Sequence, residues 1–81
     1  MPVIDRADGW RVFFYSNEEG EPSHVHLIKG ACKMKVWLHP VSVAKVFDCK
    51  AKERKAAEKL VAANRDIYAR EWEDYERTKQ R

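Results

Sequence analysis

Two short runs of alternating apolar and polar residues, 24–29 and 32–38, flank the dipeptide Gly30-Ala31. A two-residue turn that begins with glycine fixes the register of a β-hairpin, and the register decides which side chains share a face. The expected pairs on one face are Lys29 with Cys32, Leu27 with Met34 and Val25 with Val36. The expected pairs on the other face are Ile28 with Lys33, His26 with Lys35 and His24 with Trp37. One face is therefore apolar, whereas the other is basic and aromatic.

The length of the chain limits what this hairpin can join. Eighty-one residues suit a single domain spanning residues 1–81, near the lower limit at which one hydrophobic core is sufficient. Hydrophobic residues make up 44% of the chain and charged residues 36%, which is typical of a small folded protein rather than a disordered one.

A further strand is expected at residues 10–15, directly after the turn signal Asp8-Gly9, because the segment is rich in aromatic and branched residues. Its even-numbered residues would join the apolar face of the hairpin. The polar segment 16–22 contains glycine and proline and is expected to be a loop. The apolar residues of segment 41–47 suit either a strand or a helical turn, and we expect it to be irregular.

The remainder of the chain favours helix. From Asp48, the expected N-cap, the composition is strongly helix-forming, and the region 50–77 contains neither glycine nor proline. It predicts one long helix or two consecutive helices joined near Asn64, followed by a basic tail at 78–81. The expected apolar stripe has the three-and-four spacing of an amphipathic helix. It comprises Ala57, Leu60, Val61, Asn64, Ile67, Tyr68, Trp72 and Tyr75.

These elements predict an α+β fold, a three-stranded antiparallel meander packed on one face by the C-terminal helical region. The opposite face of the sheet would then be exposed. It would carry Arg11, Phe13, Tyr15, His24, His26, Lys33, Lys35 and Trp37. Small monomers seldom leave an aromatic strip with a basic rim uncovered, so these residues are the expected partner-binding site. The same mixture of side chains can stack bases and neutralise phosphates.

The histidines allow two chemical alternatives. His24 and His26 could act as acid and base in metal-independent RNA cleavage, with Lys35 or Arg11 holding the phosphate. Together with His39 they could also bind zinc, but no convincing further ligand has a fixed position beside them. We therefore expect no metal and no cofactor, and we favour a non-catalytic role.

Charge and cysteine content bear on partner and compartment. The net charge of +3 is mild, but Lys50, Lys52, Arg54, Lys55 and Lys59 form a basic run. This run is either a solvated helix face or a set of nucleic-acid contacts. Two cysteines without metal-ligand spacing are expected to be free buried thiols in a reducing compartment. With no apolar run as long as a membrane span and no signal-peptide pattern, the expected location is the cytoplasm.

Several segments resemble a known family. Residues 1–4, the run Gly9-Trp-Arg-Val-Phe-Phe-Tyr-Ser-Asn17, the element Pro22-Ser-His-Val-His26 and the late Trp72 are similar to small bacterial proteins classed as the domain of unknown function 4160 family. The resemblance implies that His24 and His26 are the signature pair of the family. It also implies genes that neighbour a second small family, as in toxin–antitoxin pairs or mobile elements. Ser23 stands where a second proline is common.

The predicted function is therefore a small interaction module of toxin–antitoxin or mobile-element type. It would bind a protein partner, and nucleic acid as a further candidate, through the aromatic and basic sheet face. The ribonuclease toxin is one alternative. A phage-borne inhibitor of a host defence nucleoprotein complex, which would also use the basic helix, is another. The oligomeric state is left open.

Overall fold

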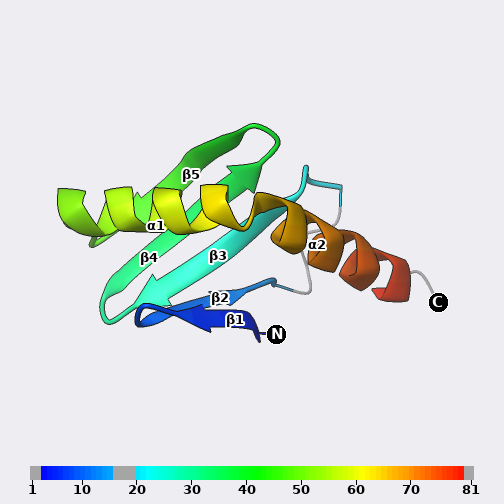
Figure 1. Cartoon of the computed structure of the whole chain (residues 1–81), viewed down its shortest axis with the longest axis horizontal. Helices are drawn as coiled ribbons and strands as arrows, with labels where there is room; N and C mark the ends of the chain where they lie inside the picture. Colours follow the sequence, from blue (N-terminus) through cyan, green and yellow to red (C-terminus); the bar gives the residue numbers. More distant parts are fainter. Residues whose placement is uncertain (1–2, 16–19, 80–81) are drawn as a thin grey trace.

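The fold is α+β, and its single sheet is antiparallel throughout. A computed structural model describes residues 3–15 and 20–79 of the chain (Figure 1). The strands follow one another in the order β1-β2-β3-β4-β5, and two consecutive helices complete the chain. The strands are β1 (Val3–Ala7), β2 (Trp10–Phe13), β3 (His24–Lys29), β4 (Cys32–Leu38) and β5 (Val41–Phe47). The helices are α1 (Ala51–Ala63) and α2 (Arg65–Lys79).

The sheet has five strands, so the prediction of three was wrong. The sequence pattern did not predict β1, which pairs with β2. Segment 41–47, expected to be irregular, is β5 and pairs with β4. The spacing of its apolar residues suits both a strand and a helical turn. The backbone N–H and C=O groups along the edge of β4 offer hydrogen-bond partners to a strand, and the segment pairs there. β2 ends at Phe13, two residues earlier than expected.

The central hairpin has the predicted register. β3 and β4 pair His24 with Trp37, His26 with Lys35 and so on to Lys29 with Cys32, without a shift. Gly30 has a φ of 59°, in the left-handed region that glycine adopts at low cost. The turn chemistry alone was therefore sufficient to assign the side chains of both strands to opposite faces.

The helical region divides into the two consecutive helices that were one of the expected alternatives. Asn64 separates them, and its side-chain amide donates a hydrogen bond to the Leu60 carbonyl at 2.9 Å. α1 begins after Lys50 rather than after Asp48, whose φ of 57° is incompatible with an N-cap. The prediction of a basic tail at 78–81 was wrong for residues 78–79, which belong to α2. Residues 80–81 lie outside the described part of the chain.

The core lies between the helices and one face of the sheet. α1 packs on β4 and β5, and α2 packs on β3 and β4. Figure 1 shows both helices on the same side of the sheet. The core cluster comprises Trp10, Val12, Val25, Leu27, Cys32, Met34, Val36 and Leu38 of the sheet, Phe14 directly after β2, and Ala57, Val61, Tyr68 and Trp72 of the helices.

The predicted helical stripe is correct except at one position. Ile67 is 61% exposed. It precedes the buried Tyr68, and successive residues of an α-helix are rotated by about 100° around its axis. Of these two neighbours, Tyr68 faces the core and Ile67 does not.

One hydrogen bond joins the first strand to the last helix. The Tyr68 hydroxyl in α2 donates to the Asp5 carboxylate in β1 at 2.6 Å, and the other carboxylate oxygen accepts from the Arg6 backbone N–H. Burial raises the pKa of Tyr68 above its ordinary value of 10.0, and the hydrogen bond and negative charge of Asp5 act in the same direction. The phenol therefore stays protonated in the folded state.

The two cysteines form a disulfide, so the prediction of free thiols was wrong. Cys32 begins β4, and Cys49 follows the end of β5. Because β4 and β5 are neighbours, their Cα atoms lie 4.5 Å apart. Because the sequence did not predict β5, it gave no reason to expect the two cysteines to lie close together. The cysteine content no longer supports a reducing compartment.

We predict that Cys49→Ser lowers the free energy of unfolding by about 3 kcal/mol, because it removes a crosslink that restricts the unfolded chain over a 17-residue separation. Urea denaturation measures the effect. Reductant should destabilise the wild type to a similar extent and leave the variant unchanged. A wild type whose stability is insensitive to reductant would contradict the prediction.

We predict that Tyr68→Phe lowers the free energy of unfolding by about 1–3 kcal/mol at neutral pH, since the Asp5 carboxylate loses its donor. Above about pH 10 the unfolded chain releases the phenol proton while the folded chain retains it, so the wild type loses stability as pH rises. Denaturation measured at increasing pH above about 10 should show that the difference in unfolding free energy between the wild type and the variant becomes smaller. A constant difference would argue against the protonated, buried phenol.

Candidate functional site: the uncovered face of the sheet

Among the described residues, one face of the sheet has no helix over it except at the start of β3, where Trp72 of α2 contacts His24. We call this the uncovered face. Strand pairing places its side chains in rows across the strands, because directly paired residues share a face. The first row consists of Arg6, Arg11, Ile28, Lys33 and Phe47. The second row consists of Val3, Phe13, His26, Lys35 and Lys45, and the third includes His24, Trp37 and Ser42.

Positive charge dominates this face. Arg6, Arg11, Lys33 and Lys45 are all exposed. Among residues 3–15 and 20–79, no carboxylate forms an ion pair with any of these four side chains. The uncovered face therefore carries exposed cations on four of its five strands, β1, β2, β4 and β5, which is more extensive than the sequence predicted.

An aromatic cluster lies beside the cations, but it is less exposed than expected. The Phe13 and His26 rings stack with their centroids 5.6 Å apart, and Tyr15 packs edge-on against both rings. Phe13 is only 1% exposed, so the expectation that it faces solvent was wrong. Tyr15 is 38% exposed and His26 is partly exposed. Neighbouring rings thus cover Phe13 and leave the other two accessible.

His24 is fully buried, contrary to the prediction. Its ring centroid lies 4.6 Å from that of Trp72 in α2 and 5.5 Å from that of Trp37. Its Nδ1 atom lies 2.9 Å from the Pro22 carbonyl oxygen, which can only accept a hydrogen bond. α2 reaches the start of β3 and covers the ring there. His24 and His26 remain neighbours, with centroids 5.1 Å apart, but only His26 is accessible.

Lys35 is also largely buried, although it was expected to be exposed. Its ammonium group forms an ion pair with Glu21 and lies 4.7 Å from the centroid of the Trp37 ring. Both contacts hold the charge near the sheet. A shallow hollow of about 200 Å³ lies beside it, and its lining includes His26, Lys45 and Phe47.

Three residues of the uncovered face were missed by the sequence reasoning. Arg6 lies on β1, and Lys45 and Phe47 lie on β5. Neither strand was expected, so nothing placed their side chains on the sheet. The alternation from Val41 to Phe47 was the one available signal, and it became interpretable only once the pairing with β4 was known.

The other sequence-predicted residues lie elsewhere. The basic run of α1, comprising Lys50, Lys52, Arg54, Lys55 and Lys59, is exposed, and Arg54 pairs with Glu58. α1 covers the opposite face of the sheet, so this run is separated from the uncovered face by the core. His39 lies in the exposed turn after β4. No group of His, Cys, Asp or Glu in the described residues could hold a metal ion.

Comparison with known proteins identifies the family. The model of the DUF4160 family, described as a domain of unknown function, matches residues 9–73. The chain belongs to the DUF4160 family. The match covers β2 to β5, all of α1 and the first part of α2. Arg11, His24 and His26 of this DUF4160 chain therefore lie within the matched region. Searches of curated proteins and of solved structures found no significant match.

In the described part of this DUF4160 chain, neither helix has the length and apolarity required to cross a membrane.

We predict that His24→Ala destabilises the fold by about 2 kcal/mol or more, since it removes a buried ring packed between two tryptophans. The sequence placed His24 on an exposed face, and its burial is the reason to expect a loss of stability. His26→Ala is the matched control and should cost less, because its ring is partly exposed. Thermal denaturation followed by circular dichroism compares the two, and equal losses would contradict the prediction.

Proposed function

We propose that this chain is a non-catalytic interaction module that binds a negatively charged partner on the uncovered face of its sheet. The observation that carries the proposal is the set of exposed cations on that face, Arg6, Arg11, Lys33 and Lys45, with no carboxylate partner among the described residues. Such a surface attracts acidic macromolecules and accelerates their association. The toxin–antitoxin or mobile-element setting implied by the family resemblance belongs to the same proposal.

Accessible aromatic side chains support binding rather than simple solubility. Phe47 is 66% exposed and pairs with Lys33, and Tyr15 is 38% exposed and packs against His26. Rings next to basic side chains are enriched where proteins contact partners. A face that served only to keep the protein in solution would gain nothing from exposed rings.

The geometry does not favour the ribonuclease alternative. Acid–base cleavage of RNA would require both imidazoles to reach the reacting phosphodiester. His24 has no exposed surface and contacts Trp72, so it cannot touch a substrate in this conformation. Of the two residues expected to hold the phosphate, Lys35 is occupied by Glu21, whereas Arg11 is exposed.

The inhibitor alternative, which would use the basic helix together with the sheet face, also has a geometric difficulty. The basic run of α1 and the uncovered face lie on opposite sides of the molecule. One partner could contact both only by wrapping around the domain.

We predict that reversing two charges on the uncovered face, with Lys33→Glu and Lys45→Glu together, weakens binding of acidic probes by about tenfold or more. Both side chains are exposed and form no ion pair with the described residues, so the fold should be retained. Fluorescence anisotropy with a labelled oligouridine and with a labelled polyglutamate peptide measures the effect.

The matched control is Lys52→Glu with Lys59→Glu, which makes the same change in net charge on the exposed side of α1. It should alter affinity by less than about twofold. Equal losses in the two double variants, or the failure of both probes to bind the wild type, would refute the uncovered face as the binding site. Cleavage of the RNA probe that disappears in His26→Ala would refute a non-catalytic function.

A further inference from the structure

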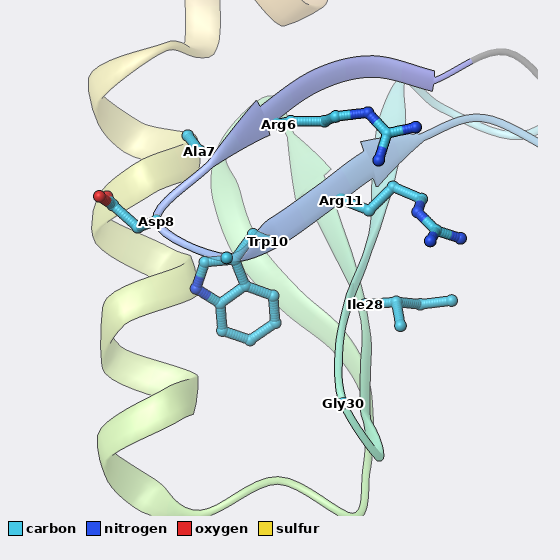
Figure 2. A pocket seen from close by; sticks show the side chains of 8 residues that line it. Arg6, Ala7, Asp8, Trp10, Arg11, Ile28 and Gly30 are labelled. Carbon is cyan, nitrogen blue, oxygen red and sulfur yellow. The ribbon is translucent and has the colours of Figure 1, made fainter.

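Two arginines lie directly opposite each other at the edge of the uncovered face. Arg6 on β1 and Arg11 on β2 are paired in the antiparallel register, just before and after the turn at Asp8-Gly9. Figure 2 shows their side chains extending to the same side of the sheet as Ile28, whereas Asp8 and Trp10 lie on the other side of the turn. The arginines line a hollow of about 510 Å³.

Like charges placed directly opposite each other on neighbouring strands destabilise a sheet. The acidic side chains nearby do not compensate for this pair. Asp5 accepts hydrogen bonds from Tyr68 and from the Arg6 backbone, and Asp8 points away in Figure 2. In the described ranges, neither guanidinium has a carboxylate partner. The isolated domain therefore holds an electrostatic conflict that a bound anion would relieve.

The guanidinium group favours phosphate as that anion. It presents a planar fork of donors that matches two phosphate oxygens at once, and two opposed forks can hold one phosphate between them. A single arginine on a surface would be unremarkable. Two arginines in register, extending to one side of the sheet and without a carboxylate partner among the described residues, can converge on one phosphate.

The row that begins with these arginines continues across the sheet to an exposed ring. After Ile28 comes Lys33 on β4 and then Phe47 on β5, at successive spacings of about 4.8 Å. Cations along a backbone path combined with exposed rings for stacking characterise surfaces that bind single-stranded nucleic acid. In a duplex the faces of the bases are stacked and hidden, so a ring such as Phe47 could not reach them.

We propose that Arg6 and Arg11 form a phosphate-binding pair for single-stranded nucleic acid, and that Phe47 stacks on a base at the far end of the same row. This inference rests on the proposed function and names the class of its partner. The strand would cross the β-strands along the row, with Lys33 contacting its backbone between the two ends.

The experiment measures binding of a labelled oligouridine of about 12 nucleotides at several salt concentrations. We expect Arg6→Gln with Arg11→Gln to weaken binding about tenfold or more and to reduce the salt slope by about 0.7 for each phosphate that the variant no longer neutralises. Phe47→Ala should weaken binding about fivefold or more without changing the salt slope. Arg54→Gln with Arg70→Gln, two exposed helical positions, is the control of equal charge and should change affinity by less than about twofold.

Folding is checked independently of binding. Because the double arginine variant removes a repulsion, its thermal midpoint should equal or exceed that of the wild type. If the midpoint of the double variant falls well below that of the wild type, the single variant Arg11→Lys is used in its place. That variant keeps the charge but lacks the fork, and it should weaken binding while preserving the salt slope. Unchanged affinity in Arg11→Lys would refute the bidentate site.

The outcomes separate this inference from the proposed function. If Lys33→Glu with Lys45→Glu abolishes oligouridine binding but the arginine variant binds normally, the phosphate pair is wrong and the basic face stands. If only the polyglutamate peptide binds, the partner is an acidic protein and the nucleic-acid inference is wrong. If inorganic phosphate raises the thermal midpoint of the wild type but oligouridine does not bind, the pair takes free phosphate and the inference is likewise overturned.

Discussion

The pairing of β3 with β4 is the constraint on which the rest of the structure depends. Its register sends Val25, Leu27, Met34 and Val36 to one face, where the helices bury them. A slip of one residue would exchange the faces, placing the aliphatic side chains in solvent and the lysines under α1. The burial of that aliphatic face is what makes the register the stable one.

From the central hairpin, neighbouring strands extend the same division of side chains in both directions. β2 adds Arg11 to the uncovered face, and β1 places Arg6 opposite it. On the other side, β5 adds Lys45 and Phe47. Helices cover one face only, so polar and basic residues accumulate on the other. The concentration of positive charge is thus a consequence of sheet topology acting on alternating sequences, and the proposed binding role depends on it.

Two long-range links stabilise the ends of this arrangement. The disulfide between Cys32 and Cys49 joins the start of β4 to the segment before α1, and the Tyr68–Asp5 hydrogen bond joins α2 to β1. A domain of 81 residues buries a limited apolar area, so such links carry a larger share of its stability than they would in a larger protein. They also hold the two edge strands, which carry the outermost residues of the candidate site.

Features that depend on neighbours along the chain could be read from the amino-acid sequence. Turn chemistry at Gly30 set the hairpin register, and helical periodicity located the buried side chains of α1 and α2, with Ile67 as the exception. The other features depend on contacts between segments that are distant in the chain. β1 and β5 are strands because each pairs with an adjacent edge, and the cysteines meet because β4 and β5 are neighbours. His24 is buried because α2 brings Trp72 over it. Contacts between distant segments have no local signature, and they decide which polar residues on the exposed face of a strand are nevertheless buried.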